Sequence, residues 1–192
     1  MIKDAHRASE IITRIRAMTR NAPPVQLAVD IKNVIADVLS FARGELLAKG
    51  VSVRLALLES LPGIVGDRVQ LQQVMLNLVM NAVEAMASVT DRERVLAITS
   101  QRADDGSPIV TVEDSGPGLD AANLDRIFDA FFTTKPGGMG MGLSISTSIV
   151  EAHRGRLWVS PNLPHGTAFH VKLPVASDME AHSDKGALVS AC

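Results

Sequence analysis

A long helix with a wide apolar face, predicted to begin at Gly66-Asp67, constrains the fold of this 192-residue chain most strongly. Asp67 is a typical N-cap residue, because its carboxylate can accept hydrogen bonds from the first backbone N–H groups of a helix. Apolar residues then recur at three- and four-residue steps and form one face. They are Leu71, Val74, Met75, Leu78, Val79, Ala82, Val83 and Met86. A face of this width has to be buried on a second layer.

Shorter segments around this helix supply that layer. The hydrophobic pattern predicts two more helices, at 35–47 and 143–153. It predicts strands at 25–31, 51–55, 94–101, 109–113, 156–160 and 167–173, the last two forming a hairpin. Because strands and helices do not alternate regularly, we expect an α+β fold in which a mixed, mostly antiparallel sheet packs on three helices.

Both ends of the chain are predicted to lie outside this unit. Residues 4–20 read as a helix that Pro23-Pro24 ends, because proline lacks a backbone donor. Its apolar stripe must pack on the following domain or pair with another chain, and the Pro-Pro hinge favours the second. After Pro174 the chain is small and polar, which predicts a disordered tail. The expected segments are therefore 1–24, 25–175 and 176–192.

Composition excludes several classes of function. Charged residues make up 21% and nearly cancel, at a formal net charge of −2, so no electrostatic reason points to a nucleic-acid partner. The single cysteine, Cys192, excludes an internal disulfide framework and a zinc site built on several thiolates. No apolar run reaches the roughly 18 residues that would span a bilayer, and the first residues lack a signal-peptide core. We expect a cytoplasmic protein.

Two asparagines interrupt the apolar face of the long helix. Asn77 and Asn81 are four residues apart, so they lie on one helix face. Polar side chains on such a face need partners. They are either amides that cap a neighbouring loop or oxygen ligands for a divalent cation such as Mg²⁺.

An acidic residue and two glycines follow the strand at 109–113. Asp114 stands at the end of this strand, and Gly116 and Gly118 come directly after it. Glycine permits positive φ and lets a ligand approach the backbone closely. A carboxylate at this point could accept hydrogen bonds from an exocyclic amine, although an ordinary turn has the same composition.

Two further segments suit a phosphate-bearing ligand. Three phenylalanines gather in residues 127–135, as in a small satellite core that includes Phe128, and Lys135 at the end is a candidate phosphate contact. The glycine-rich loop at 137–142 then runs directly into a helix, whose first N–H groups form an anion site. The loop is neither a Walker A motif nor a dinucleotide fingerprint.

In this order, the four segments resemble the sequence boxes of the histidine-kinase ATP-binding catalytic domain. That family belongs to a wider group with gyrase B, Hsp90 and MutL. Residues 77–81 resemble its N box, 114–118 its first glycine box, 128–135 its F box, 138–142 its second glycine box and 166–169 its last glycine motif. The resemblance covers roughly 25–175 and implies a two-layer α/β sandwich of the Bergerat type. The helix at 4–20 resembles the second helix of the kinase dimerisation hairpin.

The resemblance also implies roles for individual residues. Asn81 would bind Mg²⁺, and Asn77 would support the phosphate side. Asp114 would bind the adenine amine of ATP with Thr167 nearby, and residues from about 120 to 141 would form a lid. The complete ATP-binding set implied is Asn77, Asn81, Asp114, Gly116, Gly118, Lys135, Gly138, Gly140, Met141, Gly142, Leu143 and Thr167.

Two departures from the family pattern bear on the reaction. ATP-hydrolysing relatives carry a glutamate four residues before the magnesium asparagine, where it activates water, and this chain has Asn77 there. The site therefore fits phosphoryl transfer better than hydrolysis. Many kinases of the family place a lysine three residues after that asparagine, and this chain has Glu84, which we leave outside the site.

A phosphoacceptor histidine followed by an acidic residue is missing. His6 is followed by Arg7, and His153, His165, His170 and His182 all come after the second glycine box. We therefore expect a fragment of a sensor kinase that binds Mg²⁺-ATP without phosphorylating itself.

Its expected partners are the phosphoacceptor helix of the parent kinase, a response regulator receiver domain and, in the parent, a second copy of the chain. The parent could be anchored in a membrane or not. The alternatives are an ATP-hydrolysing clamp of the gyrase, Hsp90 or MutL type and an anti-sigma-factor-like regulator.

Overall fold

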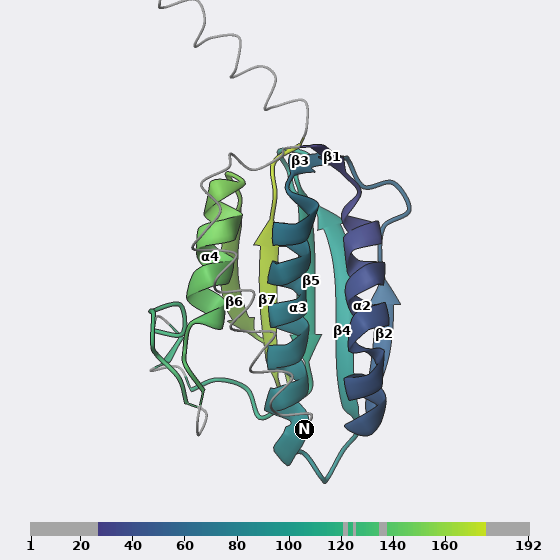
Figure 1. Cartoon of the computed structure of the whole chain (residues 1–192). Helices are drawn as coiled ribbons and strands as arrows, with labels where there is room; N and C mark the ends of the chain where they lie inside the picture. Colours follow the sequence, from purple (N-terminus) through teal and green to yellow (C-terminus); the bar gives the residue numbers. More distant parts are fainter. Residues whose placement is uncertain (1–26, 121–122, 125, 135–137, 176–192) are drawn as a thin grey trace, which may run out of the picture.

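Three helices cover one face of a five-stranded sheet (Figure 1). The structure is a computed structural model that describes residues 27–120, 123–124, 126–134 and 138–175. Its elements are β1 (Leu27–Val29), α2 (Ile31–Ala48), β2 (Val51–Ala56), β3 (Ile64–Gly66), α3 (Arg68–Ala85), the short 3₁₀ helix η1 (Met86–Ser88), β4 (Arg94–Arg102), β5 (Pro108–Asp114), α4 (Gly142–Ala152), β6 (Arg156–Pro161) and β7 (Thr167–Lys172). The predicted α+β sandwich is confirmed.

The sheet is mixed and mostly antiparallel, as predicted. Its strand order is β2-β4-β5-β7-β6, and only the β2–β4 pair is parallel. β1 and β3 form a separate antiparallel pair, to which Val175 adds one bridge through Ile64. The order brings the end of β5 beside the start of β7, although these two points are far apart in the sequence.

The predicted apolar face of α3 forms the centre of the core. None of its eight residues is more than 3% exposed, from Leu71 to Met86. They pack against the inward-facing residues of the sheet, which include Leu96, Ile98 and Val112. The core therefore lies between α3 and the central strands, and α2 and α4 flank α3 on either side (Figure 1).

Two predicted boundaries were wrong, and one strand was missed. The strand predicted at 25–31 ends at Val29, because the Asp30 carboxylate accepts a hydrogen bond from Lys32 N (2.9 Å) and starts α2 four residues earlier than expected. Residues 25 and 26 lie outside the described residues. β3 is three residues long, too short to show the two-residue alternation of a strand. The predicted helix at 4–20, with His6, and the predicted tail at 176–192 lie outside the described residues.

The predicted N-cap of α3 is confirmed, and it also ties α3 to α4. The Asp67 carboxylate accepts hydrogen bonds from Val69 N and Gln70 N, while Asp67 N donates to Nε2 of His153 (2.9 Å). Because Nε2 is the acceptor, His153 carries its proton on Nδ1 and donates to the Ile149 carbonyl (2.7 Å). His153 is only 2% exposed, so it is a structural residue that joins the C-terminal end of α4 to the start of α3.

We predict that His153→Ala lowers the free energy of unfolding by at least about 2 kcal/mol, because it leaves the buried Asp67 N–H without an acceptor and opens a cavity. Urea denaturation followed by circular dichroism measures this difference. His165→Ala is the matched control: His165 is exposed, and its removal should change stability by less than about 0.5 kcal/mol. Equal stability of the two variants would contradict the structural role of His153.

Candidate functional site

The two asparagines of α3 are both partly buried, and Asn77 lies against α4. Nδ2 of Asn77 donates a hydrogen bond to Oγ of Ser146 on α4 (3.0 Å). The Nδ2 group of Asn77 therefore does not cap a loop, because its partner is a side chain on the neighbouring helix. Asn81 is one helical turn further along and is half-buried.

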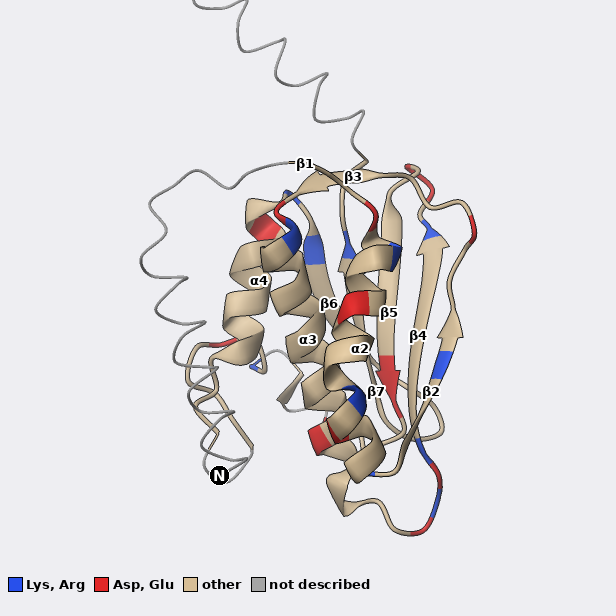
Figure 2. Cartoon of the chain, turned by 45° about the vertical axis from the view of Figure 1, so that its right-hand side comes forward, with Lys and Arg blue, Asp and Glu red and all other residues tan. Residues whose placement is uncertain are grey.

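The start of α4 is pressed against Asn77. A Cβ atom added to Gly142 would collide with Oδ1 of Asn77, so a larger residue at this position would displace either the Asn77 amide or the start of α4. Met141, the N-cap residue, makes no side-chain capping hydrogen bond. The first turn, from Gly142 to Ile145, contains no charged residue, and Figure 2 draws this end of α4 in tan. Backbone N–H groups at an uncapped helix start are suited to hold an anion.

A second group of site residues gathers where β5 ends and β7 begins. Asp114 is only 2% exposed, and its Oδ1 accepts a hydrogen bond from Gly116 N (2.8 Å). The β5–β7 register pairs Glu113 with Ala168, so the next step along the two strands places Thr167 opposite Asp114. The predicted proximity of Asp114 and Thr167 is therefore present in the structure.

Glycines allow the loops here to approach Asp114 closely. Gly166 has φ +107°, and a Cβ atom on it would overlap the Asp114 carbonyl oxygen. Gly118 has φ +84°, and a Cβ on it would lie 3.2 Å from the Gly166 carbonyl oxygen. The 114–118 segment and the 166–167 segment thus form one tightly packed structure.

Sequence patterns did not reveal three residues: Arg92 and Asn162, which hold this structure, and Ser146 on α4. The guanidinium of Arg92 donates to the carbonyl oxygens of Ser115 (3.2 Å) and Gly116 (3.0 Å). Nδ2 of Asn162 donates to the Asp114 carbonyl oxygen (2.9 Å), and Ser146 contacts Asn77 as described above. Arg92 and Asn162 each lie more than 20 residues from the atoms that they bind, so no local sequence pattern could reveal them.

The predicted lid is described in part. Phe128 packs against the main core, to which the buried Ile127 belongs, so the predicted small satellite core is here an extension of the main one. Phe131 is 73% exposed, and its N–H donates to the Gly140 carbonyl oxygen (2.9 Å), which links the two sides of the segment. Gly138 and Gly140 lie in the described part, whereas the candidate phosphate contact Lys135 lies outside it.

Eight of the predicted site residues fall into two groups, while Asn81 lies one turn beyond Asn77 on α3, and Gly138 and Gly140 lie in the segment before α4. One is the α3–α4 group, with Asn77, Met141, Gly142 and Leu143, and the other is the β5–β7 group, with Asp114, Gly116, Gly118 and Thr167. Glu84 is exposed on α3, as expected for a residue outside the site. Within the described residues, no three His, Cys, Asp or Glu side chains are arranged to hold a metal ion.

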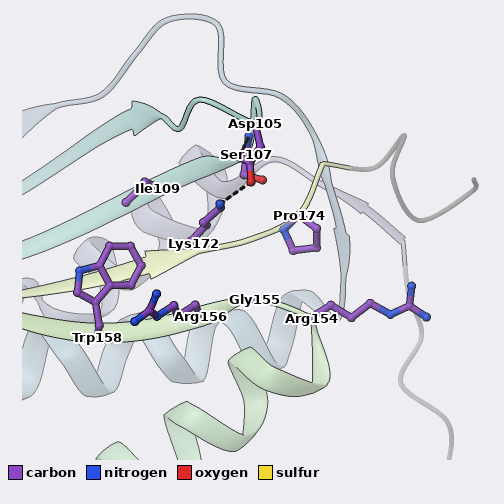
Figure 3. A pocket seen from close by; sticks show the side chains of 9 residues that line it. All are labelled: Asp105, Ser107, Ile109, Arg154, Gly155, Arg156, Trp158, Lys172 and Pro174. Atoms are coloured by element: carbon purple, nitrogen blue, oxygen red, sulfur yellow. Dashed lines mark hydrogen bonds and ion pairs between the residues drawn. The ribbon is translucent and has the colours of Figure 1, made fainter. Parts of the chain in front are cut away.

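A separate pocket of about 530 Å³ lies at the other end of the sheet (Figure 3). Most of the charged side chains that line it contact other residues of the lining. Lys172 Nζ pairs with Asp105 (2.5 Å), and this hydrogen bond, together with one from Ser107 N, lowers the pKa of Asp105 to about 2. Arg156 lies over the Trp158 ring, 5.6 Å from its centroid.

His170 completes the side-chain cluster beside this pocket. Its ring stacks on Trp158, and its two nitrogens bond Thr111 Oγ1 (3.0 Å) and Ser160 Oγ (2.8 Å). Burial lowers its pKa, which favours the neutral ring that these two hydroxyl groups accommodate. We therefore regard the cluster as a structural feature of the sheet.

Comparison with known proteins identifies the family of the chain. Residues 66–177 match the model of the histidine kinase-, DNA gyrase B- and HSP90-like ATPases. The chain is 37% identical to the sensor histidine kinase TmoS of Ectopseudomonas mendocina, over 92% of this chain and 18% of that protein. It is also 37% identical to the sensor protein FixL of Bradyrhizobium diazoefficiens, over 92% of this chain and 34% of that protein. The chain thus spans about a fifth to a third of these relatives.

Solved structures show the same fold. Full-length ShkA in complex with AMPPNP has a TM-score of 0.70 and 29% identity, and the match covers 80% of this chain and 32% of that one. The nucleotide-free catalytic domain of the histidine kinase ThkA has a TM-score of 0.68 and 29% identity, over 78% of this chain and 95% of that one. The chain therefore belongs to the family of histidine kinase-, DNA gyrase B- and HSP90-like ATPases, and its relatives place it with the catalytic domains of sensor histidine kinases.

Proposed function

We propose that this chain binds Mg²⁺-ATP and donates the γ-phosphate to a histidine on the dimerisation helix of its parent kinase. The observation that carries the proposal is the close packing of Asn77 on Gly142, at the uncapped start of α4. This geometry offers backbone N–H groups to phosphate oxygens and brings an amide beside them. The relative TmoS is named a sensor histidine kinase, which supports the same reaction.

The two groups of residues divide the nucleotide between them. On the adenine side, Asp114 would accept a hydrogen bond from the exocyclic amine, and Gly116, Gly118 and Thr167 would line the ring. On the phosphate side, the backbone of residues 138–143 and the Lys135 side chain would contact the phosphates. Asn81 would hold Mg²⁺ through its amide oxygen, and Asn77 would act beside it.

The chemistry requires positioning more than proton transfer. A histidine nitrogen attacks the γ-phosphorus, the bond to the β–γ bridging oxygen breaks, and ADP leaves with that electron pair. Bound Mg²⁺ would neutralise charge on the phosphates. The N–H groups of α4 orient the phosphates toward the acceptor. Asn77 cannot serve as a base at neutral pH, so water is not activated, which disfavours an ATP-hydrolysing clamp.

The remaining elements of the proposal concern the parent protein. Residues 1–24 would be a dimerisation helix with its hinge, 25–175 the catalytic domain and 176–192 a tail. A parent homodimer would pass the phosphate to a response regulator receiver domain; one structure of the same fold is ThkA in complex with the response regulator TrrA, at 24% identity. Among the described residues, no helix is long and apolar enough to cross a membrane. We propose that the chain acts in the cytoplasm.

We predict that Asn81→Ala and Asp114→Ala each abolish nucleotide binding, because one removes the metal ligand and the other the adenine acceptor. Isothermal calorimetry with Mg²⁺-AMPPNP measures the loss. The control is Asn33→Ala, since Asn33 is exposed on α2, and it should keep the affinity of the unchanged chain. Unchanged affinity in either site variant would overturn the assignment of that residue.

We predict that Gly142→Ala weakens Mg²⁺-AMPPNP binding at least about tenfold, which corresponds to about 1.4 kcal/mol. The added methyl group collides with Asn77 and displaces the start of α4. Gly44→Ala is the matched control, because a Cβ there meets nothing within 4 Å and Gly44 also lies in a helix. The same affinity in both variants would show that the packing of α4 on Asn77 has no part in binding.

We predict that the chain takes no acid-labile phosphate from labelled ATP alone, and that added dimerisation helices of the parent kinase become labelled. The label should fall on a histidine of those helices. Two results would contradict the proposal: appreciable label on His6, or rapid release of free phosphate with no labelled protein. The second result would favour the ATP-hydrolysing clamp.

A further inference from the structure

We propose that Ser146 is a positioning residue that sets which end of the Asn77 amide faces the nucleotide. The inference rests on the proposed nucleotide site and assigns a role to a residue that the site itself does not include. Ser146 lies in the second turn of α4 and is only 1% exposed. Its Oγ accepts a hydrogen bond from Nδ2 of Asn77 (3.0 Å), which joins α4 to α3 directly beneath Gly142.

The pairing of Ser146 differs from that of the other hydroxyl groups on α4. Ser144, Thr147 and Ser148 donate to backbone carbonyl oxygens within or next to the same helix. Ser146 instead contacts a side chain on another element. Burying a hydroxyl group costs free energy unless it has a partner, so alanine or valine would serve better if this position only filled space. A buried serine here indicates that its hydrogen bond to Asn77 is what the position supplies.

This hydrogen bond fixes the orientation of an amide that has two chemically different ends. The final torsion of asparagine is broad, so either the oxygen or the nitrogen can face a given side. With Nδ2 held by Ser146, Oδ1 is the Asn77 atom closest to the position of a Cβ on Gly142, and Nδ2 lies at 3.2 Å. Asn77 therefore presents an oxygen to the start of α4.

An amide oxygen attracts a cation or an N–H group and repels phosphate oxygens. We therefore assign Asn77 to the Mg²⁺ side of the nucleotide, directly or through a bound water, and not to direct contact with phosphate. The consequence is specific: loss of the Ser146 hydroxyl group should reduce the part of the affinity that depends on Mg²⁺. Binding of the metal-free nucleotide should change little, because its contacts with Asp114 and the α4 backbone remain.

The test compares Ser146→Thr with Ser146→Val, which have nearly the same shape and differ in whether a hydroxyl group is present. AMPPNP affinity of the full chain is measured by calorimetry with Mg²⁺ and with EDTA. The quantity compared is the gain in AMPPNP affinity that Mg²⁺ gives. We expect this gain to be at least about tenfold smaller in Ser146→Val than in the unchanged chain, and in Ser146→Thr to stay within about threefold of that of the unchanged chain. The control is Ser148→Ala, an exposed position on the same helix, which should keep the full gain. Equal Mg²⁺ dependence of the Thr and Val variants would overturn the inference.

The side-chain amide of Asn77 gives a second readout that needs no nucleotide. In ¹⁵N spectra, its two Nδ2 protons should exchange slowly with solvent in the unchanged chain and in Ser146→Thr, and faster in Ser146→Val. If the unchanged chain bound no AMPPNP, the proposed function would fail, and these spectra would still decide the positioning role. Equal exchange in the Thr and Val variants would refute it.

Discussion

Burial of the apolar face of α3 is the constraint on which the rest of the structure depends. The face from Leu71 to Met86 fills the space between the central strands and the two flanking helices. Once it is buried, the helix can rotate little, and the direction of every other side chain on it is set. Asn77 is held beside α4 by this packing, so this part of the candidate site is a consequence of the core.

α4 is attached to α3 at two levels, and each attachment uses a polar group inside an otherwise apolar contact. At its C-terminal end, His153 accepts a hydrogen bond from Asp67 N, the N-cap residue of α3. Near its N-terminal end, Ser146 accepts one from Asn77. A helix held at both ends presents its first N–H groups at a fixed place, which is what an anion site requires. His153, at one end of α4, thus helps to fix the position of the helix start at Gly142, although only Gly142 would touch the ligand.

The sequence was sufficient where the determining interactions are local. The Asp67 cap and the apolar face of α3 depend on residues a few positions apart, and the structure agrees with both. It was insufficient where the contacts are distant. Arg92 holds the 115–116 carbonyl groups, and Asn162 holds that of Asp114, through pairings that only the strand order creates. β3 escaped prediction because three residues carry no periodic signal.

The central claim is that the α3–α4 group and the β5–β7 group bind one nucleotide together. Backbone ¹⁵N spectra recorded during a titration with Mg²⁺-AMPPNP test it most directly. The account predicts that the amides of Gly116, Gly118 and residues 140–143 shift at a common affinity, while those of Arg156, Trp158 and His170 at the far end of the sheet stay in place. Shifts confined to that far end, or shifts in only one of the two site groups, would contradict it.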